Sequence, residues 1–179
     1  MVNANENGRF QVEIDVKVGD VLREPSELAM FATFEDAPLP PEITGLFEAK
    51  DFSGKAKQSL LVYPRGAIPA QRLLLVGLGK RDSDRDPLTP DSVREAAARA
   101  VRRAKELQVA AFTLGIDGGV PLDPEVAAQA FAEGIELGVY RYWQYRTNLT
   151  EEEKFKVEKV TVFTSAEREQ AIRAGFETG

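Results

Sequence analysis

The order of apolar and polar positions predicts several strands in the first half of the chain. Apolar and polar residues alternate from Phe10 to Val18, the period-two pattern of a strand with one solvated face. The run Leu28–Phe34 is apolar throughout and predicts a strand covered on both faces. We expect two further strands at Ser59–Tyr63 and Arg72–Val76, and a short helix from Pro41 to about Glu48.

The second half of the chain alternates helix and strand. The expected elements are a helix capped by Thr89 or Asp91 that runs to Leu107, a strand at Val109–Ile116, a helix opened by Asp123 and Pro124, a strand at Val157–Thr164, and a helix from Ala166, capped by Ser165, towards Phe176. Repeated units of this kind predict parallel strands with helices on both faces of the sheet, whereas the alternating strands before them predict an antiparallel portion. The expected fold class is therefore α/β, a three-layer αβα arrangement around a mixed, mainly parallel sheet.

One stretch of the chain, Phe131–Thr147, is rich in aromatic residues and predicts a helix with two apolar sides. It holds the only Trp and three of the four Tyr. At about 100° per residue, Phe131 and Ile135 share one face, whereas Leu137 and Tyr140 lie opposite. A helix buries one face in its own domain, so large side chains on the other side need a second surface. We predict an interface that contains Leu137, Tyr140, Trp143 and Tyr145.

Two glycines in the same helix indicate close packing. Gly134 and Gly138 are four residues apart, and each costs about 0.8–1 kcal/mol relative to Ala in a soluble helix. We expect this cost to be offset where a neighbouring strand or helix approaches closely.

Composition removes several kinds of chemistry. The 179 residues include no Cys and no His, which excludes disulfides, thiolate or imidazole metal sites and histidine-based catalysis. A net charge of -6 opposes attraction to nucleic acid or an anionic membrane, so neither is an expected partner. No apolar run approaches the roughly 18 residues of a membrane span, and the polar segment 1–8 does not resemble a signal peptide. We expect a cytoplasmic protein with a flexible tail at 1–9 and a single α/β domain at 10–179.

The turn Gly77–Lys80 is the place where an α/β fold could hold a phosphate, because it follows a strand and precedes a helix. Asp82 stands where a dinucleotide fingerprint has its third Gly, and Arg81 where a Walker loop has Ser or Thr. We therefore interpret the glycines as steric support for a tight turn.

Charged clusters elsewhere are interpreted as solvated surface. The helix after Thr89 carries Arg94, Arg99, Arg102, Arg103 and Lys105, but no stacking aromatic accompanies them. Asp82, Asp84 and Asp86 alternate as the ligands of a calcium loop do, but the central Gly and the closing Glu of such a loop are absent, and the consecutive run Glu151–Glu153 cannot converge on one ion without a sharp turn.

Several segments resemble the N-terminal domain of the leucine (cytosol) aminopeptidase family. They are Arg72–Lys80, the Ala-rich helix that ends at Leu107, Ala132–Tyr142 with Tyr145–Thr147, Ala171–Gly175 and, more weakly, Phe52–Lys55. The similarity extends over roughly Phe10 to Gly179, and Ala132–Thr147 is its most specific part.

The resemblance implies a macro-domain-like fold and a role without catalysis. Members of the family are two-domain exopeptidases that form hexamers, with two divalent metals (Zn or Mn) in the C-terminal domain near an Asn-Thr-Asp-Ala-Glu-Gly-Arg motif that this sequence lacks. No catalytic, cofactor-binding or metal-binding residue is therefore implied here. The implied partners are the protein's own C-terminal catalytic domain and further copies in a homo-oligomer, with a role in assembly and active-site access. The alternative is a stand-alone macro-like domain that binds ADP-ribose or a related nucleotide near Gly77–Lys80.

Overall fold

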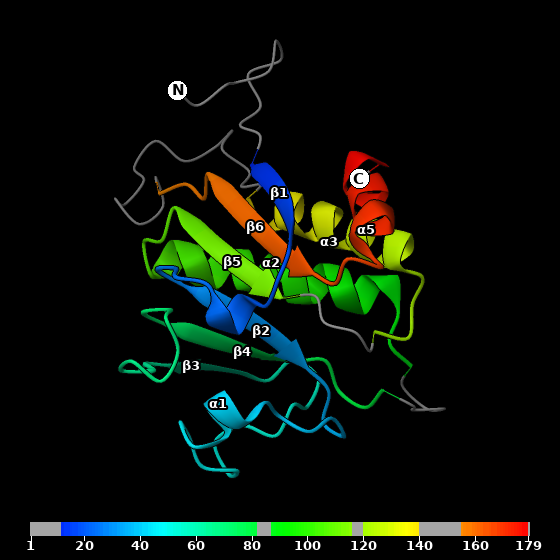
Figure 1. Ribbon diagram of the computed structural model, residues 1–179. Helices are drawn as coiled ribbons and strands as arrows, with labels where there is room; N and C mark the ends of the chain where they lie inside the picture. Colours follow the sequence, from blue (N-terminus) through cyan, green and yellow to red (C-terminus); the bar gives the residue numbers. More distant parts are fainter. Residues whose placement is uncertain (1–11, 82–86, 116–119, 140–154, 179) are drawn as a thin grey trace, which may run out of the picture.

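The structure is a computed structural model that describes residues 12–81, 87–115, 120–139 and 155–178. These residues form one sheet of six strands in the order β1-β6-β5-β2-β4-β3 (Figure 1). The strands are β1 (Glu13–Val18), β2 (Ala29–Thr33), β3 (Ser59–Val62), β4 (Leu73–Gly77), β5 (Ala111–Gly115) and β6 (Lys159–Thr164). The predicted tail at 1–9 lies outside the described residues.

The sheet is mixed and mainly parallel, as the sequence predicts. Only β3 runs antiparallel, paired with its neighbour β4. The expectation of antiparallel pairing was wrong for β1, which pairs parallel to β6 with Glu13 opposite Lys159. The alternating pattern of β1 arises because it is an edge strand with one solvated face: Val16 is buried, whereas Lys17, which points the other way, is exposed. Alternation reports a solvated face and carries no information on strand direction.

Three long helices lie side by side on one face of the sheet (Figure 1). They are α2 (Pro90–Glu106), α3 (Pro124–Val139) and α5 (Glu169–Thr178). In the part of the chain that the structure describes, the other face carries short elements, η1 (Val21–Arg23) and α1 (Pro41–Thr44), with the loops around them. Parallel crossovers are right-handed, so the direction in which the chain moves along the sheet decides the face. From β4 through β5 to β6 the chain moves towards the β1 edge, whereas from β1 through β2 to β4 it moves towards the β3 edge. The connections of the two halves therefore lie on opposite faces of the sheet.

Local signals explain where the helices begin and end. Thr89 caps α2 by accepting a hydrogen bond from the Ser92 N–H, and Pro90 occupies the first turn, as expected. The last helix begins at Glu169, three residues later than expected, because the chain after Ser165 first forms a turn in which the Arg168 N–H bonds the Ser165 carbonyl. The helix α1 is a single turn that ends at Gly45, shorter than predicted.

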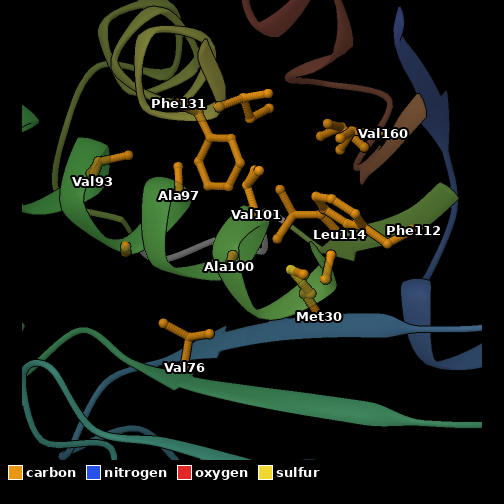
Figure 2. Close-up of a cluster of buried hydrophobic side chains, with 14 of the residues drawn as sticks. Met30, Val76, Val93, Ala97, Ala100, Val101, Phe112, Leu114, Phe131 and Val160 are labelled. Carbon is orange, nitrogen blue, oxygen red and sulfur yellow. The ribbon is translucent and has the colours of Figure 1, made fainter. Parts of the chain in front are cut away.

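The larger hydrophobic core fills the space between the sheet and the three long helices. In Figure 2, Phe131 of α3 points towards Ala97 and Val101 of α2, and Val76 of β4 points towards α2 from the sheet. A second core lies on the opposite face, where Leu22, Ile43, Phe52, Leu73 and Phe163 are buried together. Both faces of the central strands are therefore covered, which is why their sequences are apolar at successive positions. None of the described helices is both long and apolar enough to cross a bilayer.

Candidate functional site

The helix α3 has one buried face, as its periodicity predicts, and an apolar side chain on the opposite face. Ile135 is fully buried, whereas Leu137, two residues along, is 59% exposed. Tyr140, Trp143 and Tyr145 lie outside the described residues, so the structure places only Leu137 of the predicted interface. Its position on the free side of α3 agrees with the expected helical geometry, and its role in an interface stays a prediction.

The helices α2 and α3 approach each other closely at the two glycines of α3. A Cβ atom added at Gly138 would lie 2.8 Å from the Val101 Cβ and 3.0 Å from the Ala98 carbonyl oxygen. Any larger residue at either glycine position of α3 would push the two helices apart. The expectation of a close neighbour is confirmed, and the neighbour is α2.

A polar cluster borders the same helix pair. Arg94 of α2 donates from Nε to Glu133 of α3 and also pairs with Asp91 in its own first turn. The hydrogen bond to Glu133 is the largest cause of a raised Arg94 pKa. Gln129 donates to the other Glu133 oxygen at 3.1 Å. These contacts orient α3 relative to α2 and place charged groups beside its free face.

The glycine turn after β4 is held by hydrogen bonds within the protein. The N–H groups of Gly77, Leu78, Gly79 and Arg81 donate to the carbonyl oxygens of Gln58, Thr33 and Gly54 and to Asp36 Oδ1, at 2.8–3.2 Å. A Cβ at Gly77 would lie 2.1 Å from the Lys55 carbonyl oxygen, and Gly79 adopts a φ of 83°. The glycines thus serve the turn, and most of its N–H groups are engaged.

An apolar crevice opens at the carboxyl ends of β2, β4 and β5, with a volume of about 420 Å³. It lies where the connection from β2 passes to one face of the sheet and that from β5 to the other, the usual ligand position in open α/β sheets. Phe34, Leu78 and Phe131 line it, together with Arg81, whose guanidinium lies 5.2 Å from the centre of the Phe34 ring. The sequence offered no signal for this crevice, because its residues come from separate elements.

The basic residues of α2 are only partly the solvated face that was expected. Arg94 is tied to α3, and Arg103 donates to Glu106 in its own helix at 2.6 Å. Arg99 departs further from expectation, because its side chain is half-buried and its Nη1 atom is shielded from solvent. Arg99 lies beside residues of β3 and β4, which are distant in sequence, so the charge pattern of α2 alone could not reveal this burial.

The metals implied by the family resemblance have no matching donor set in the part of the chain that the structure describes. Within 12–81, 87–115, 120–139 and 155–178, no three Asp or Glu side chains come together in an arrangement that could hold a metal ion. The acidic runs at 82–86 and 151–153 lie outside these ranges.

The family model and the curated relatives similar to this chain are cytosol aminopeptidases. The family model described as cytosol aminopeptidase family, N-terminal domain, matches residues 20–149. A probable cytosol aminopeptidase of Roseiflexus castenholzii is 38% identical over 168 residues, which is 94% of this chain and 34% of the relative. The chain therefore spans about a third of the length of that relative.

Solved structures show the same fold. A tomato leucine aminopeptidase mutant superposes with a TM-score of 0.66 at 23% identity, over 92% of this chain and 35% of that protein. A macrodomain mutant of Oceanobacillus iheyensis with ADPR has a TM-score of 0.66 at 12% identity, over 98% of this chain and 95% of that one. The macro-domain-like architecture is confirmed by this likeness. On the strength of the family match over most of its length, the chain belongs to the cytosol aminopeptidase family and corresponds to its N-terminal domain.

Proposed function

We propose that this chain is the non-catalytic N-terminal domain of a dinuclear-metal leucyl aminopeptidase, a cytoplasmic enzyme that removes N-terminal residues from peptides. The observation that carries the proposal is the family match over residues 20–149 in a chain one third as long as its relative. In this proposal the two metals, Zn or Mn, belong to the C-terminal catalytic domain. The 179-residue chain contributes to assembly and to the access of peptides.

The free face of α3 supports the assembly role. Leu137 exposes 59% of its surface on the side opposite the buried Ile135, and Val126 near the start of the same helix exposes 42%. Apolar side chains exposed on one helix face fit a surface that another domain or subunit covers. The charged cluster around Glu133 lies between them and would form the polar part of such an interface.

Activity measurements test the first part of the proposal. The 179-residue chain, assayed with leucine p-nitroanilide and added Mn²⁺ or Zn²⁺, is expected to show no turnover, whereas the chain extended by its catalytic domain is expected to be active. Metal-dependent turnover by the short chain alone would refute the non-catalytic role.

Assembly can be tested separately with the intact protein. Leu137→Glu is expected to reduce the mass of the homo-oligomer, expected to be a hexamer, in light scattering, because a carboxylate would be buried at the interface. Leu137→Met preserves an apolar side chain and is expected to assemble normally. An unchanged mass for Leu137→Glu would remove α3 from the proposed interface.

The domain limits are part of the proposal. We treat 10–179 as one folded domain preceded by a tail at 1–9. Limited proteolysis followed by mass spectrometry is expected to remove the tail and leave the remainder intact. Early cleavage inside a described element, such as β4 or α2, would contradict a single domain.

The crevice at the carboxyl ends of β2, β4 and β5 keeps the alternative function open. Its volume of about 420 Å³ is within the usual range for a small-molecule site, and it adjoins Leu78 and Arg81 of the glycine turn. The engaged N–H groups of that turn argue against phosphate binding there. Calorimetry with ADP-ribose decides the matter: a dissociation constant below about 100 μM would favour the nucleotide-binding alternative, and weaker binding would favour the aminopeptidase domain.

A further inference from the structure

A second cavity lies under α2 near the β3 edge of the sheet, whereas α5 lies near the β1 edge. It has a volume of about 290 Å³ and lies between α2 and the strands β3 and β4. Its sheet wall is formed by Ser59, Leu61, Leu74 and Val76, which face α2 because Ser59 pairs with Val76 and Leu61 with Leu74 across the antiparallel ladder. Among the described residues no long helix covers the edge strand β3 on this face, and the cavity is bounded by side chains that extend from α2.

The helix wall of this cavity is basic. Arg99, Arg102 and Arg103 line it together with a single carboxylate, that of Glu106. Glu106 already accepts a hydrogen bond from Arg103 Nη1 at 2.6 Å. Three guanidinium groups and one carboxylate leave an excess of positive charge next to the apolar side chains of the sheet, where electrostatic interactions are stronger than in water.

Arg99 is the residue whose position calls for a ligand. Its Nη1 atom is buried, and among the residues that the structure describes no hydrogen-bond acceptor reaches that atom. Burial is the main cause of a lowered Arg99 pKa, Glu95 acts in the opposite direction, and Arg102 lowers the pKa further. Glu95 is also 4.0 Å from Lys57, so its charge is shared.

A buried donor on a charged group is costly unless both its hydrogen bond and its charge are matched. A water molecule could accept a hydrogen bond from Arg99, but it would leave unbalanced the positive charge by which the three arginines exceed the one carboxylate of Glu106. An anion with several acceptor oxygens supplies both. The planar fork of arginine suits phosphate because two N–H groups can bind two oxygens in parallel.

We propose that the cavity between α2 and the β3–β4 edge is an oxyanion site that takes a phosphate group, with the half-buried Arg99 and its neighbours Arg102 and Arg103 as the guanidinium donors that line it. The hydroxyl of Ser59 on the sheet wall offers a further donor. This site is distinct from the crevice at the carboxyl ends of the strands and does not depend on the proposed aminopeptidase function.

The test is a titration of the 179-residue chain with inorganic phosphate at constant ionic strength, followed by thermal unfolding and by calorimetry. We expect saturable binding and, at ten times the dissociation constant, a rise in Tm of about 3–6 °C. Arg99→Met is expected to weaken binding by roughly tenfold or more, because the buried guanidinium fork is lost. This variant should fold, since it replaces a half-buried guanidinium, whose Nη1 atom has no hydrogen-bond partner among the described residues, with an apolar side chain.

Arg94→Met is the matched control, because Arg94 belongs to the same helix but is bound to Glu133 on the α3 side. It is expected to keep the phosphate response of the unaltered chain, whatever its own stability. A second ligand, phenyl phosphate, identifies the source of the phosphate group: binding of both indicates a site open to phosphorylated molecules, and binding of inorganic phosphate alone indicates a site for the free ion. A rise in Tm that is unsaturable, or equal in the unaltered chain and Arg99→Met, would overturn the proposal, because phosphate then acts only as a general stabilising salt.

Discussion

Gly134 of α3 lies against the backbone of Arg94 in α2. A Cβ atom at Gly134 would come within 2.5 Å of the Arg94 carbonyl oxygen and within 2.7 Å of the Ala97 Cβ. Backbone atoms cannot rotate away as a long side chain can, so the distance between the two helices depends on a missing side chain. The same close contact places α3 next to α2 so that the Arg94 side chain reaches Glu133.

Gly134→Ala is therefore expected to destabilise the chain, although Ala is the better helix former. The gain in helix propensity is about 0.8–1 kcal/mol. Forcing a methyl group into a packed contact costs typically 1–3 kcal/mol, so the steric cost exceeds the gain. We expect a net loss of about 1–2 kcal/mol in the free energy of unfolding, measured by urea denaturation.

Gly45→Ala is a matched control for this glycine series. A Cβ at Gly45 would meet nothing within 4 Å, and its φ of -85° suits any residue. The expected change is a gain of up to about 1 kcal/mol, because Ala has fewer unfolded conformations to lose. Equal losses for both substitutions would show that close packing between α2 and α3 is not the cause.

Gly77→Ala tests the turn that follows β4. The added Cβ would overlap the Lys55 carbonyl oxygen at 2.1 Å and lie 2.7 Å from the Gly54 carbonyl carbon. The two segments would have to separate, and the hydrogen bond from the Gly77 N–H to the Gln58 carbonyl would be lost. We expect a loss of about 3 kcal/mol or more in unfolding free energy, together with a lower yield of folded protein. A loss below about 1 kcal/mol would show that the backbone at Lys55 can move away from residue 77 at little cost, which would contradict the steric role of Gly77.

Thr89→Ala tests the start of α2. Thr89 Oγ1 accepts the Ser92 N–H at 3.2 Å, and Ser92 Oγ accepts the Thr89 N–H in return. Removing the side chain leaves a helix N–H without a partner, which costs about 1 kcal/mol. Circular dichroism during thermal unfolding measures the change. Thr89→Ser keeps the oxygen and should retain most of the stability, whereas an equal loss in both variants would contradict a capping role.

The two sides of α3 can be separated by a pair of substitutions. Ile135→Ala is expected to cost about 2–5 kcal/mol, because it empties a fully buried position. Leu137→Ala is expected to change the unfolding free energy of the isolated chain by no more than about 0.5 kcal/mol, because its side chain is 59% exposed. A large loss for Leu137→Ala in denaturation of the isolated chain would show that its role is internal packing.

Much of the fold could be predicted from the sequence, and each error has its own physical reason. The helices opened by Pro90 and Pro124 were placed to within a residue of their starts, because a cap, a proline and an apolar stripe coincide there. The direction of β1 was wrong, because alternation records exposure and not pairing. The late start of the last helix reflects a turn that is only weakly encoded.

The candidate sites divide in the same way. The sequence predicts that Ile135 and Leu137 lie on different sides of α3, because positions on one helix are related by a fixed angle. The burial of the Arg99 Nη1 atom was not, because it depends on where the edge strands β3 and β4 lie beneath α2. The engagement of the Gly77–Lys80 turn likewise depends on Thr33, Gly54 and Gln58, which lie far from it in sequence.

Residues a few positions apart are enough to predict the kind and order of the elements and the apolar face of α3, and the pair Gly134 and Gly138 indicates that some neighbour approaches closely there. Only the folded arrangement shows which face each helix covers, which strand runs antiparallel, and that the Arg99 Nη1 atom is shielded while Arg94 and Arg103 of the same helix have carboxylate partners. These features arise from contacts between segments distant in the chain, and such contacts form only when strand order and handed crossovers bring the segments together.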